Sequence, residues 1–131
     1  YSNLVEADTV VIADPEQLKK VINNIISNSV KYMNKSHGII DIRILDEVDS
    51  IRVEIEDNGK GIAQKDLSKI FDRFYRTDAS RNSAQGGSGI GLSIVRKIIE
   101  DHGGYIWATS KEGEGTCMHF VMRKYRELNK E

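Results

Sequence analysis

The chain has 131 residues, the length of one domain that can bury a core without a metal or a disulfide. Its single cysteine, Cys117, excludes an internal disulfide and indicates a reducing compartment. The 19 Lys and Arg nearly balance the 20 Asp and Glu, which argues against a nucleic-acid or anionic-membrane partner, and no apolar run reaches transmembrane length. We therefore expect one domain over residues 1–131.

The first predicted elements are a strand and a capped helix. Val10 to Ala13 is strand-like, and Asp14 and Pro15 then predict the start of a helix. Asp14 can cap this helix, proline suits its first position, and Gln17 can complete a capping box. One face of the helix should be buried, because its members follow helical spacing. They are Leu18, Val21, Ile22, Ile25, Ile26, Ser29 and Met33.

A hairpin follows the helix. Apolar and charged residues alternate over residues 40–44 and again over residues 51–56, which predicts two strands with one buried face. Asp57 continues the parity of the apolar positions in the second strand. A carboxylate that points toward a buried side is costly unless a group there hydrogen-bonds to it, so Asp57 is a candidate functional residue.

The second half predicts two helices and another hairpin. Lys65 to Phe74 and Gly91 to His102 have helical spacing, and Tyr105 to Ser110 pairs with Thr116 to Met122. Between the helices, Arg76 to Gly89 contains no large apolar side chain, so we expect it to be mobile. The predicted fold is an α+β, two-layer α/β sandwich. About three helices cover one face of a mixed, mostly antiparallel sheet.

Eight of the eleven glycines fall in three clusters, at residues 57–62, 86–92 and 113–116. Glycine lets backbone N–H groups approach a polyanion, so the clusters predict a phosphate-bearing ligand. Their spacing matches neither the Walker loop nor the dinucleotide fingerprint. A polar stripe on the first helix adds amides, an ammonium group and a phenol, which together indicate a nucleotide pocket. The stripe consists of Asn24, Asn28 and Lys31, followed by Tyr32.

Five segments, in this order, resemble the boxes of the sensor histidine kinases. They are the asparagine-rich helix, D-N-G-K-G-I, I-F-D-R-F-Y-R, G-G-S-G-I-G-L-S-I-V and G-E-G-T. The resemblance runs from about Asp14 to Met122, and five boxes in order make a chance match very improbable. It implies the ATP-binding sandwich that type II topoisomerases, mismatch-repair ATPases and heat-shock chaperones share, with a flexible ATP lid between the F-Y-R segment and the second glycine cluster.

The resemblance also implies roles for individual residues. Asp57 would accept a hydrogen bond from the adenine amine, and Thr116 would join the same water network. Asn28 would ligate magnesium, because a neutral amide oxygen suits Mg²⁺ that phosphate oxygens also hold. Asn24 and Lys31 would lie beside the metal and the phosphates as catalytic and binding residues.

Further nucleotide contacts come from the same resemblance. Tyr32 would lie against the base or ribose, and Arg76 would reach the γ-phosphate during transfer as a catalytic residue. The glycine clusters would turn around the base and phosphates, with a helix N-terminus facing the anion. These nucleotide-binding residues are Gly59, Gly61, Ile62, Gly87, Gly89, Ile90, Gly91 and Leu92.

The implied activity is two-component phosphoryl transfer from magnesium-ATP to a histidine. His37 lies in a predicted turn, His102 ends a helix and His119 lies in a strand, so none has the family's acceptor context. We expect the acceptor on an upstream dimerisation domain and a response regulator downstream. This chain would then bind ATP and ADP as a monomeric piece of a homodimer, on the cytoplasmic side of a membrane-anchored sensor.

Two other functions are compatible with the same fold. An ATP hydrolase or clamp would need a water-activating glutamate four residues before the magnesium asparagine, and Asn24 stands there. A serine kinase of the anti-sigma type, or a nucleotide-gated interaction module without catalysis, is the alternative from a different class. Acid lability of the phosphorylated product distinguishes histidine from serine as the acceptor.

Overall fold

The computed structural model describes residues 2–3, 13–33, 36–72 and 91–124. Of the strand expected at Val10 to Ala13, only Ala13 belongs to these residues, and it is not in a strand. The expected mobile segment Arg76 to Gly89, which includes the lid, lies outside them.

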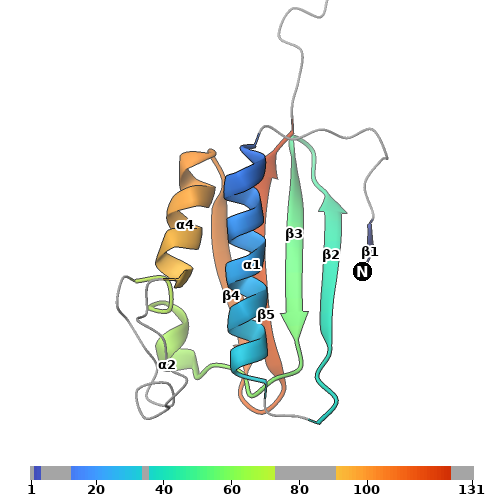
Figure 1. The fold of residues 1–131 in the computed structure, drawn as a ribbon, viewed down its shortest axis with the longest axis vertical. Coiled ribbons are helices and arrows are strands. Elements are labelled where there is room, and N and C mark those ends of the chain that lie inside the picture. Colours follow the sequence, from blue (N-terminus) through green and yellow to red (C-terminus); the bar gives the residue numbers. More distant parts are fainter. Residues whose placement is uncertain (1, 4–12, 34–35, 73–90, 125–131) are drawn as a thin grey trace, which may run out of the picture.

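Five strands form one mixed sheet in the order β1-β2-β3-β5-β4 (Figure 1). β1 pairs in parallel with β2, and the other three neighbouring pairs are antiparallel. The sheet is therefore mixed and mostly antiparallel, as predicted, although the short β1 was not. The strands are β1 (Ser2–Asn3), β2 (Ile40–Asp46), β3 (Ser50–Asp57), β4 (Tyr105–Lys111) and β5 (Gly115–Arg123).

The helices lie on one face of this sheet, which confirms the two-layer sandwich. α1 (Pro15–Lys31) runs along the strands with α4 (Gly91–Asp101) beside it, and the short α2 (Gln64–Leu67) contacts β4 (Figure 1). Within the described part of the chain, no helix has both the length and the apolar character needed to cross a membrane.

The start of α1 depends on a local cap and on one distant contact. The Oδ1 atom of Asp14 accepts hydrogen bonds from the backbone N–H groups of Glu16 and Gln17, at 2.9 and 3.4 Å. The backbone N–H of Asp14 donates to Nε2 of His102 at 3.1 Å, so a histidine from the end of α4 takes the place predicted for the side chain of Gln17. The distant contact therefore replaces the reciprocal half of a capping box.

The predicted helices differ in how well their ends were placed. α4 ends as expected: the N–H groups of Gly103 and Gly104 bond to the carbonyls of Glu100 and Ile99, the pattern of a Schellman motif. α2 is much shorter than the helix predicted from Lys65 to Phe74, because its last regular residue is Leu67. Tight turns follow it up to residue 72 and still bury Ile70 and Phe71.

The core lies between the helices and the inner face of the sheet. Alternate residues of β3 point inward, as the alternation of the first hairpin predicted. Alternate residues of β5 point inward as well, and both sets meet the apolar stripes of α1 and α4. The opposite face of the sheet bears mainly charged and aromatic side chains. The buried core comprises Val21, Ile25, Val53, Ile55, Ile70, Phe71, Val95, Ile98, Ile99, Met118, Phe120 and Met122.

Candidate functional site

The inner face of the sheet changes from apolar to polar at a single row of residues. Thr116 of β5 is paired with Asp57 of β3 on one side and with Ser110 of β4 on the other. The next row into the core is Ile55, Met118 and Ala108, all apolar. The three polar side chains, which we call the polar row, therefore lie where the core ends.

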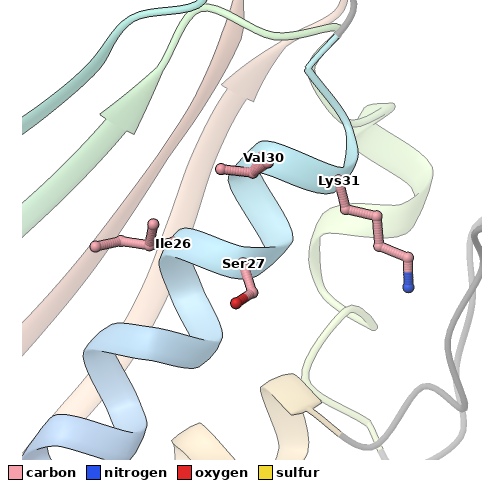
Figure 2. A pocket seen from close by; sticks show the side chains of 4 residues that line it. All are labelled: Ile26, Ser27, Val30 and Lys31. Carbon is pink, nitrogen blue, oxygen red and sulfur yellow. The ribbon is translucent and has the colours of Figure 1, made fainter.

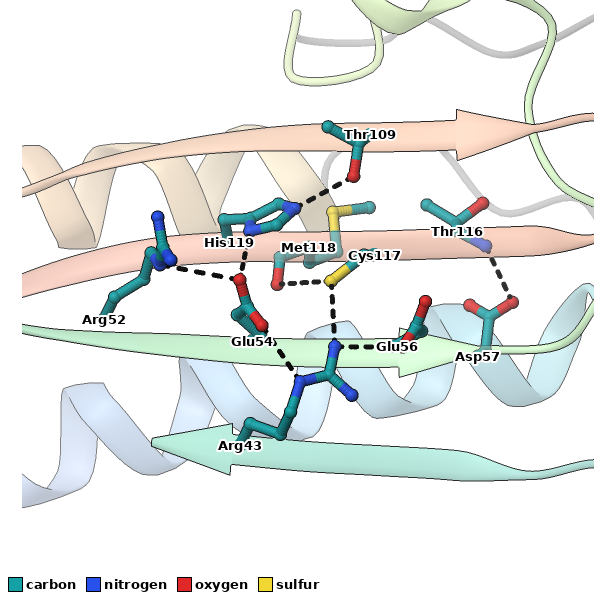
Figure 3. A network of polar contacts seen from close by, with 10 residues as sticks. All are labelled: Arg43, Arg52, Glu54, Glu56, Asp57, Thr109, Thr116, Cys117, Met118 and His119. Atoms are coloured by element: carbon teal, nitrogen blue, oxygen red, sulfur yellow. Dashed lines mark hydrogen bonds and ion pairs between the residues drawn. The ribbon is translucent and has the colours of Figure 1, made fainter. Parts of the chain in front are cut away.

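Asp57 is partly buried, and hydrogen bonds hold its carboxylate in place. Its Oδ1 atom accepts from the backbone N–H of Gly59 at 2.9 Å. It also accepts from the backbone N–H of Thr116 at 3.3 Å, the bond drawn in Figure 3. These bonds offset the free-energy cost of burying a carboxylate and fix the position of one of its oxygens. The second oxygen remains suited to accept a hydrogen bond from a ligand.

Ser110 belongs to this site, and the sequence analysis did not single it out. Its Oγ atom accepts from the N–H of Ile62 at 2.7 Å, donates to the carbonyl of Gly115 at 2.8 Å, and lies 2.9 Å from Oγ1 of Thr116. A signal was available, because Ser110 has the same inward parity as two apolar residues of its strand. Applying the parity argument to this second hairpin would have found it.

Three segments far apart in the sequence meet below the polar row. The N–H of Lys60 bonds to the carbonyl of Tyr32 at 3.4 Å, and the N–H of Gly113 bonds to the carbonyl of Lys60 at 2.8 Å. The end of α1, the loop after β3 and the turn before β5 are thereby joined. The segments of three predicted boxes therefore converge at one end of the sheet.

Two glycines are required where these segments touch. Gly61 has φ +77°, and a Cβ there would lie 2.4 Å from the carbonyl oxygen of Lys111. Gly115 has φ +128°, and its Cβ would lie 2.0 Å from the carbonyl oxygen of Asp57. Any side chain at either position would push the loop away from the sheet. Gly59 is also tight, with a Cβ position 3.0 Å from Oδ1 of Asp57.

The polar stripe of α1 leads toward this end of the sheet. Asn24, Asn28, Lys31 and Tyr32 are all partly buried. The ammonium group of Lys60 lies 4.9 Å from the ring centroid of Tyr32, and that of Lys31 lies 5.8 Å from it. Two cations therefore gather around one aromatic ring, an arrangement suited to an anionic ligand.

A shallow depression runs along α1 next to the stripe. Ile26, Ser27, Val30 and Lys31 line it, and Figure 2 shows Lys31 pointing away from the side to which Ile26 and Val30 point. Of these residues only Lys31 was predicted to bind the nucleotide. We therefore place the candidate site at the polar row, where the hydrogen-bonded loops converge, and interpret the depression as its flank.

The structure says less about the other residues that were predicted to bind the nucleotide. Arg76, Gly87, Gly89 and Ile90 lie outside the described residues. Gly91 begins α4, and a Cβ added there would meet no described residue within 4 Å apart from its chain neighbour and the backbone of its own helix. The side chains of Ile62 and Leu92 are partly buried and pack against the core.

The open face of the sheet carries a charge network that is separate from the polar row (Figure 3). Glu54 lies at its centre and contacts Arg43 at 3.0 Å, Arg52 at 3.5 Å and Nδ1 of His119 at 3.0 Å. Burial raises the pKa of Glu54, but these partners outweigh it and lower the pKa overall. Burial lowers the pKa of His119, and its Nε2 atom lies 2.9 Å from Oγ1 of Thr109.

This network includes three side chains that could in principle ligate a metal. Glu54, Cys117 and His119 offer ligand atoms within 4.8 Å of one another. The guanidinium groups of Arg43 and Arg52 already pair with the carboxylate, and burial raises the pKa of Cys117 to about 11. A divalent cation would lie among positive charges and a protonated thiol. We therefore interpret the three as part of a structural network.

The two-layer sandwich, with glycine-lined loops converging on an inward aspartate, defines an ATP-binding domain. The family model described as "Histidine kinase-, DNA gyrase B-, and HSP90-like ATPase" matches residues 13–126, and the chain belongs to this family.

Its similarity to particular relatives is specific. It is 40% identical over 126 residues to the sensor histidine kinase WalK of Bacillus subtilis, covering 95% of this chain and 20% of that protein. Among solved structures, the catalytic domain of histidine kinase ThkA matches with TM-score 0.76 and 33% identity, over 93% of this chain and 77% of that one. The mycobacterial sensor histidine kinase MprB matches with TM-score 0.77 and 27% identity, over 89% and 78% of the two chains.

These relatives are sensor histidine kinases and their catalytic domains, and the present chain has the fold and sequence of such a catalytic domain. The chain spans about a fifth of the length of the curated relatives it matches.

Proposed function

We propose that this domain binds magnesium-ATP and transfers the γ-phosphoryl group to a histidine on a separate dimerisation domain. The observation that carries the proposal is the polar row. Hydrogen bonds hold Asp57 there on the inner face of the sheet, where the end of α1, the loop after β3 and the turn before β5 meet. An inward carboxylate with one oxygen that bonds to no described residue can accept a hydrogen bond from the adenine amine. Guanine presents a carbonyl at that position, so the same acceptor selects against it.

The residues of α1 fit the phosphate end of the nucleotide. The amide oxygen of Asn28 is a hard, neutral ligand of the kind that Mg²⁺ takes beside phosphate oxygens, and Asn24 lies one turn earlier on the same stripe. Asn28 would hold a magnesium ion there, which would neutralise part of the charge of the phosphates. Lys31 would add a positive charge beside them, and Arg76 would meet the charge that develops on the γ-phosphoryl group during transfer.

Two of the three histidines of the chain are held by contacts within the fold, which supports an acceptor that lies elsewhere. His102 donates from Nδ1 to the carbonyl of Ile98 at 2.7 Å and accepts at Nε2 from Asp14. Both ring nitrogens of His119 also contact polar partners, Glu54 and Thr109. A phosphoacceptor needs a free ring nitrogen, so only the exposed His37 could offer one without breaking a described contact.

The decisive experiment mixes the chain with a histidine-bearing helical domain from the same protein and γ-labelled ATP. We expect magnesium-dependent labelling of the added domain, no labelling of the chain alone, and an acid-labile product. An acid-stable product would favour the serine kinase instead. Free phosphate without labelled protein would favour an ATP hydrolase, which the amide at position 24 argues against.

The proposal extends to partners that the chain itself does not contain. The relatives' names as sensor kinases support an upstream sensor and dimerisation domain, a homodimeric whole protein and a response regulator. We propose the cytoplasmic side of a membrane-anchored sensor as the place where the domain works.

A further inference from the structure

We infer that Ser110 is a positioning residue of the nucleotide site. It fixes the direction in which the Thr116 hydroxyl donates its hydrogen bond and so contributes to base selection. The inference rests on the proposed function. It starts from the contacts of one partly buried hydroxyl, whose three neighbours come from two segments: Ile62 in the loop after β3, and Gly115 and Thr116 in β5.

Counting hydrogens assigns each of these contacts a direction. A serine hydroxyl has one hydrogen to donate and two lone pairs to accept with. A carbonyl can only accept, so the hydrogen of Ser110 goes to Gly115, and the N–H of Ile62 occupies one lone pair. The remaining lone pair faces Oγ1 of Thr116 at 2.9 Å. All three contacts are satisfied together only if the Thr116 hydroxyl donates to Ser110.

This direction decides what Thr116 can offer a ligand. Because Thr116 donates its hydroxyl hydrogen to Ser110, its Oγ1 atom offers only lone pairs to a ligand beside the polar row. Asp57 is also an acceptor there, so the row offers two neighbouring acceptors to the base and its water. Such a row suits the exocyclic amine of adenine and repels the carbonyl oxygen that guanine presents at the same position.

Ser110 also fastens the loop that frames the base. Its Oγ atom holds the N–H of Ile62, and its backbone carbonyl accepts from Nε2 of Gln64 at 2.9 Å. Both partners belong to the segment that continues from the glycine turn at Gly61. One residue therefore sets the loop position and the hydroxyl direction.

The test compares Ser110→Ala with Thr109→Ala, its neighbour in β4. Thr109→Ala also removes one hydroxyl from β4, but from the open face of the sheet, where the hydroxyl contacts His119. We would measure ADP and GDP affinities by competition calorimetry, together with the free energy of unfolding. Ser110→Ala should weaken ADP binding about tenfold, the loss of one hydrogen bond, and weaken GDP binding less, because Thr116 becomes free to donate. Thr109→Ala should leave both affinities unchanged.

A double-mutant cycle with Thr116→Val distinguishes the loss of the contact between the two hydroxyls from a general loosening of the site. If the two hydroxyls act as one unit, the double variant should lose little more ADP affinity than either single variant. Ser110→Cys, which keeps the volume but replaces the hydroxyl with a weak hydrogen-bonding group, serves if the alanine variant does not fold.

Equal ADP affinity in the Ser110 and Thr109 variants, or an equal loss for ADP and GDP, would overturn the inference. Failure of the wild-type chain to bind ADP would instead overturn the proposed function, so the two failures are distinguishable.

Discussion

Asp57 is the side chain on which nucleotide choice depends most directly. We predict that Asp57→Asn weakens ATP binding by about 1–3 kcal/mol, because an amide nitrogen in place of the free carboxylate oxygen would face the adenine amine. Isothermal titration calorimetry with ATP and GTP measures this. The wild type should bind ATP much more tightly than GTP, whose weak binding is measured by competition.

Glu56→Gln is the matched control for that change. Glu56 precedes Asp57 in the chain but lies on the opposite face of β3, paired with Arg43 at 2.9 Å. Removing its charge should leave ATP affinity within about twofold, since a partly exposed ion pair contributes little. Equal affinity of the wild type for ATP and GTP would remove Asp57 from adenine recognition.

Asn28 should matter for magnesium more than for folding. We predict that Asn28→Ala largely abolishes the magnesium dependence of ATP binding, because the amide oxygen is lost, while the unfolding free energy changes by less than about 1 kcal/mol. ATP titrations at several magnesium concentrations test this. Asn23→Ala supplies the control, because Asn23 is exposed on the same helix. A normal magnesium titration in Asn28→Ala would exclude Asn28 as a ligand.

The residues of the site differed in how far the sequence could place them. Asp57 was found because strand parity is a local property, and the register confirms its inward position. Strand parity could also have placed Ser110 on the inner face, but its contacts with the loop at Ile62 follow from tertiary packing and could not be predicted. The contacts of Lys60 with Tyr32 likewise join segments that the sequence keeps far apart.

At the scale of the elements, His102 connects the two main helices at the end away from the nucleotide site. We predict that His102→Ala lowers the free energy of unfolding by about 1–2 kcal/mol, since bonds to Asp14 and Ile98 are both lost. Chemical denaturation measures the change. ADP affinity should stay within about twofold, because the polar row lies at the other end of α1 (Figure 1).

His37→Ala is the control, because His37 is exposed. An unfolding free energy equal in both variants would show that the contact between His102 and Asp14 does not stabilise the domain.

Elements with strong local signals were predicted well. The cap at Asp14, the spacing of α1, the alternation in the first hairpin and the two strands predicted for the second hairpin placed five of the described elements to within about two residues. α2 was predicted too long because Ile70 and Phe71 keep a helical spacing while the backbone forms tight turns. β1 has only two residues, which are too few to show an alternation of apolar and polar positions, so its pairing with β2 could not be predicted from the sequence.

The molecule as a whole should lose stability in two steps on acidification. The pKa of His119 is lowered in the folded state, so below about pH 6.5 the unfolded chain takes up a proton that the folded chain does not. The pKa of Glu54 is also lowered, so its contribution is full above about pH 4.5 and is lost as the pH falls through its folded value. Both effects reduce stability as the pH falls.

Urea denaturation between pH 7.5 and 5.5 isolates the first step. We predict that His119→Gln flattens the decline of the unfolding free energy over this range, since the group that takes up the proton is gone. His37→Gln, at an exposed histidine, should retain the wild-type slope. A wild-type slope in His119→Gln would show that His119 does not govern the decline.

The buried thiol of Cys117 makes this domain convenient for site-selective fluorescence. With its pKa near 11 and its side chain covered, it should react slowly with maleimides at neutral pH. Val48 is 84% exposed in the turn between β2 and β3, at the end of the sheet opposite the polar row. A Val48→Cys variant should therefore take up one dye per molecule, confirmed by intact mass, and still bind ADP as the unlabelled chain does. The dye would report tumbling and assembly with a phosphoacceptor partner without touching the nucleotide.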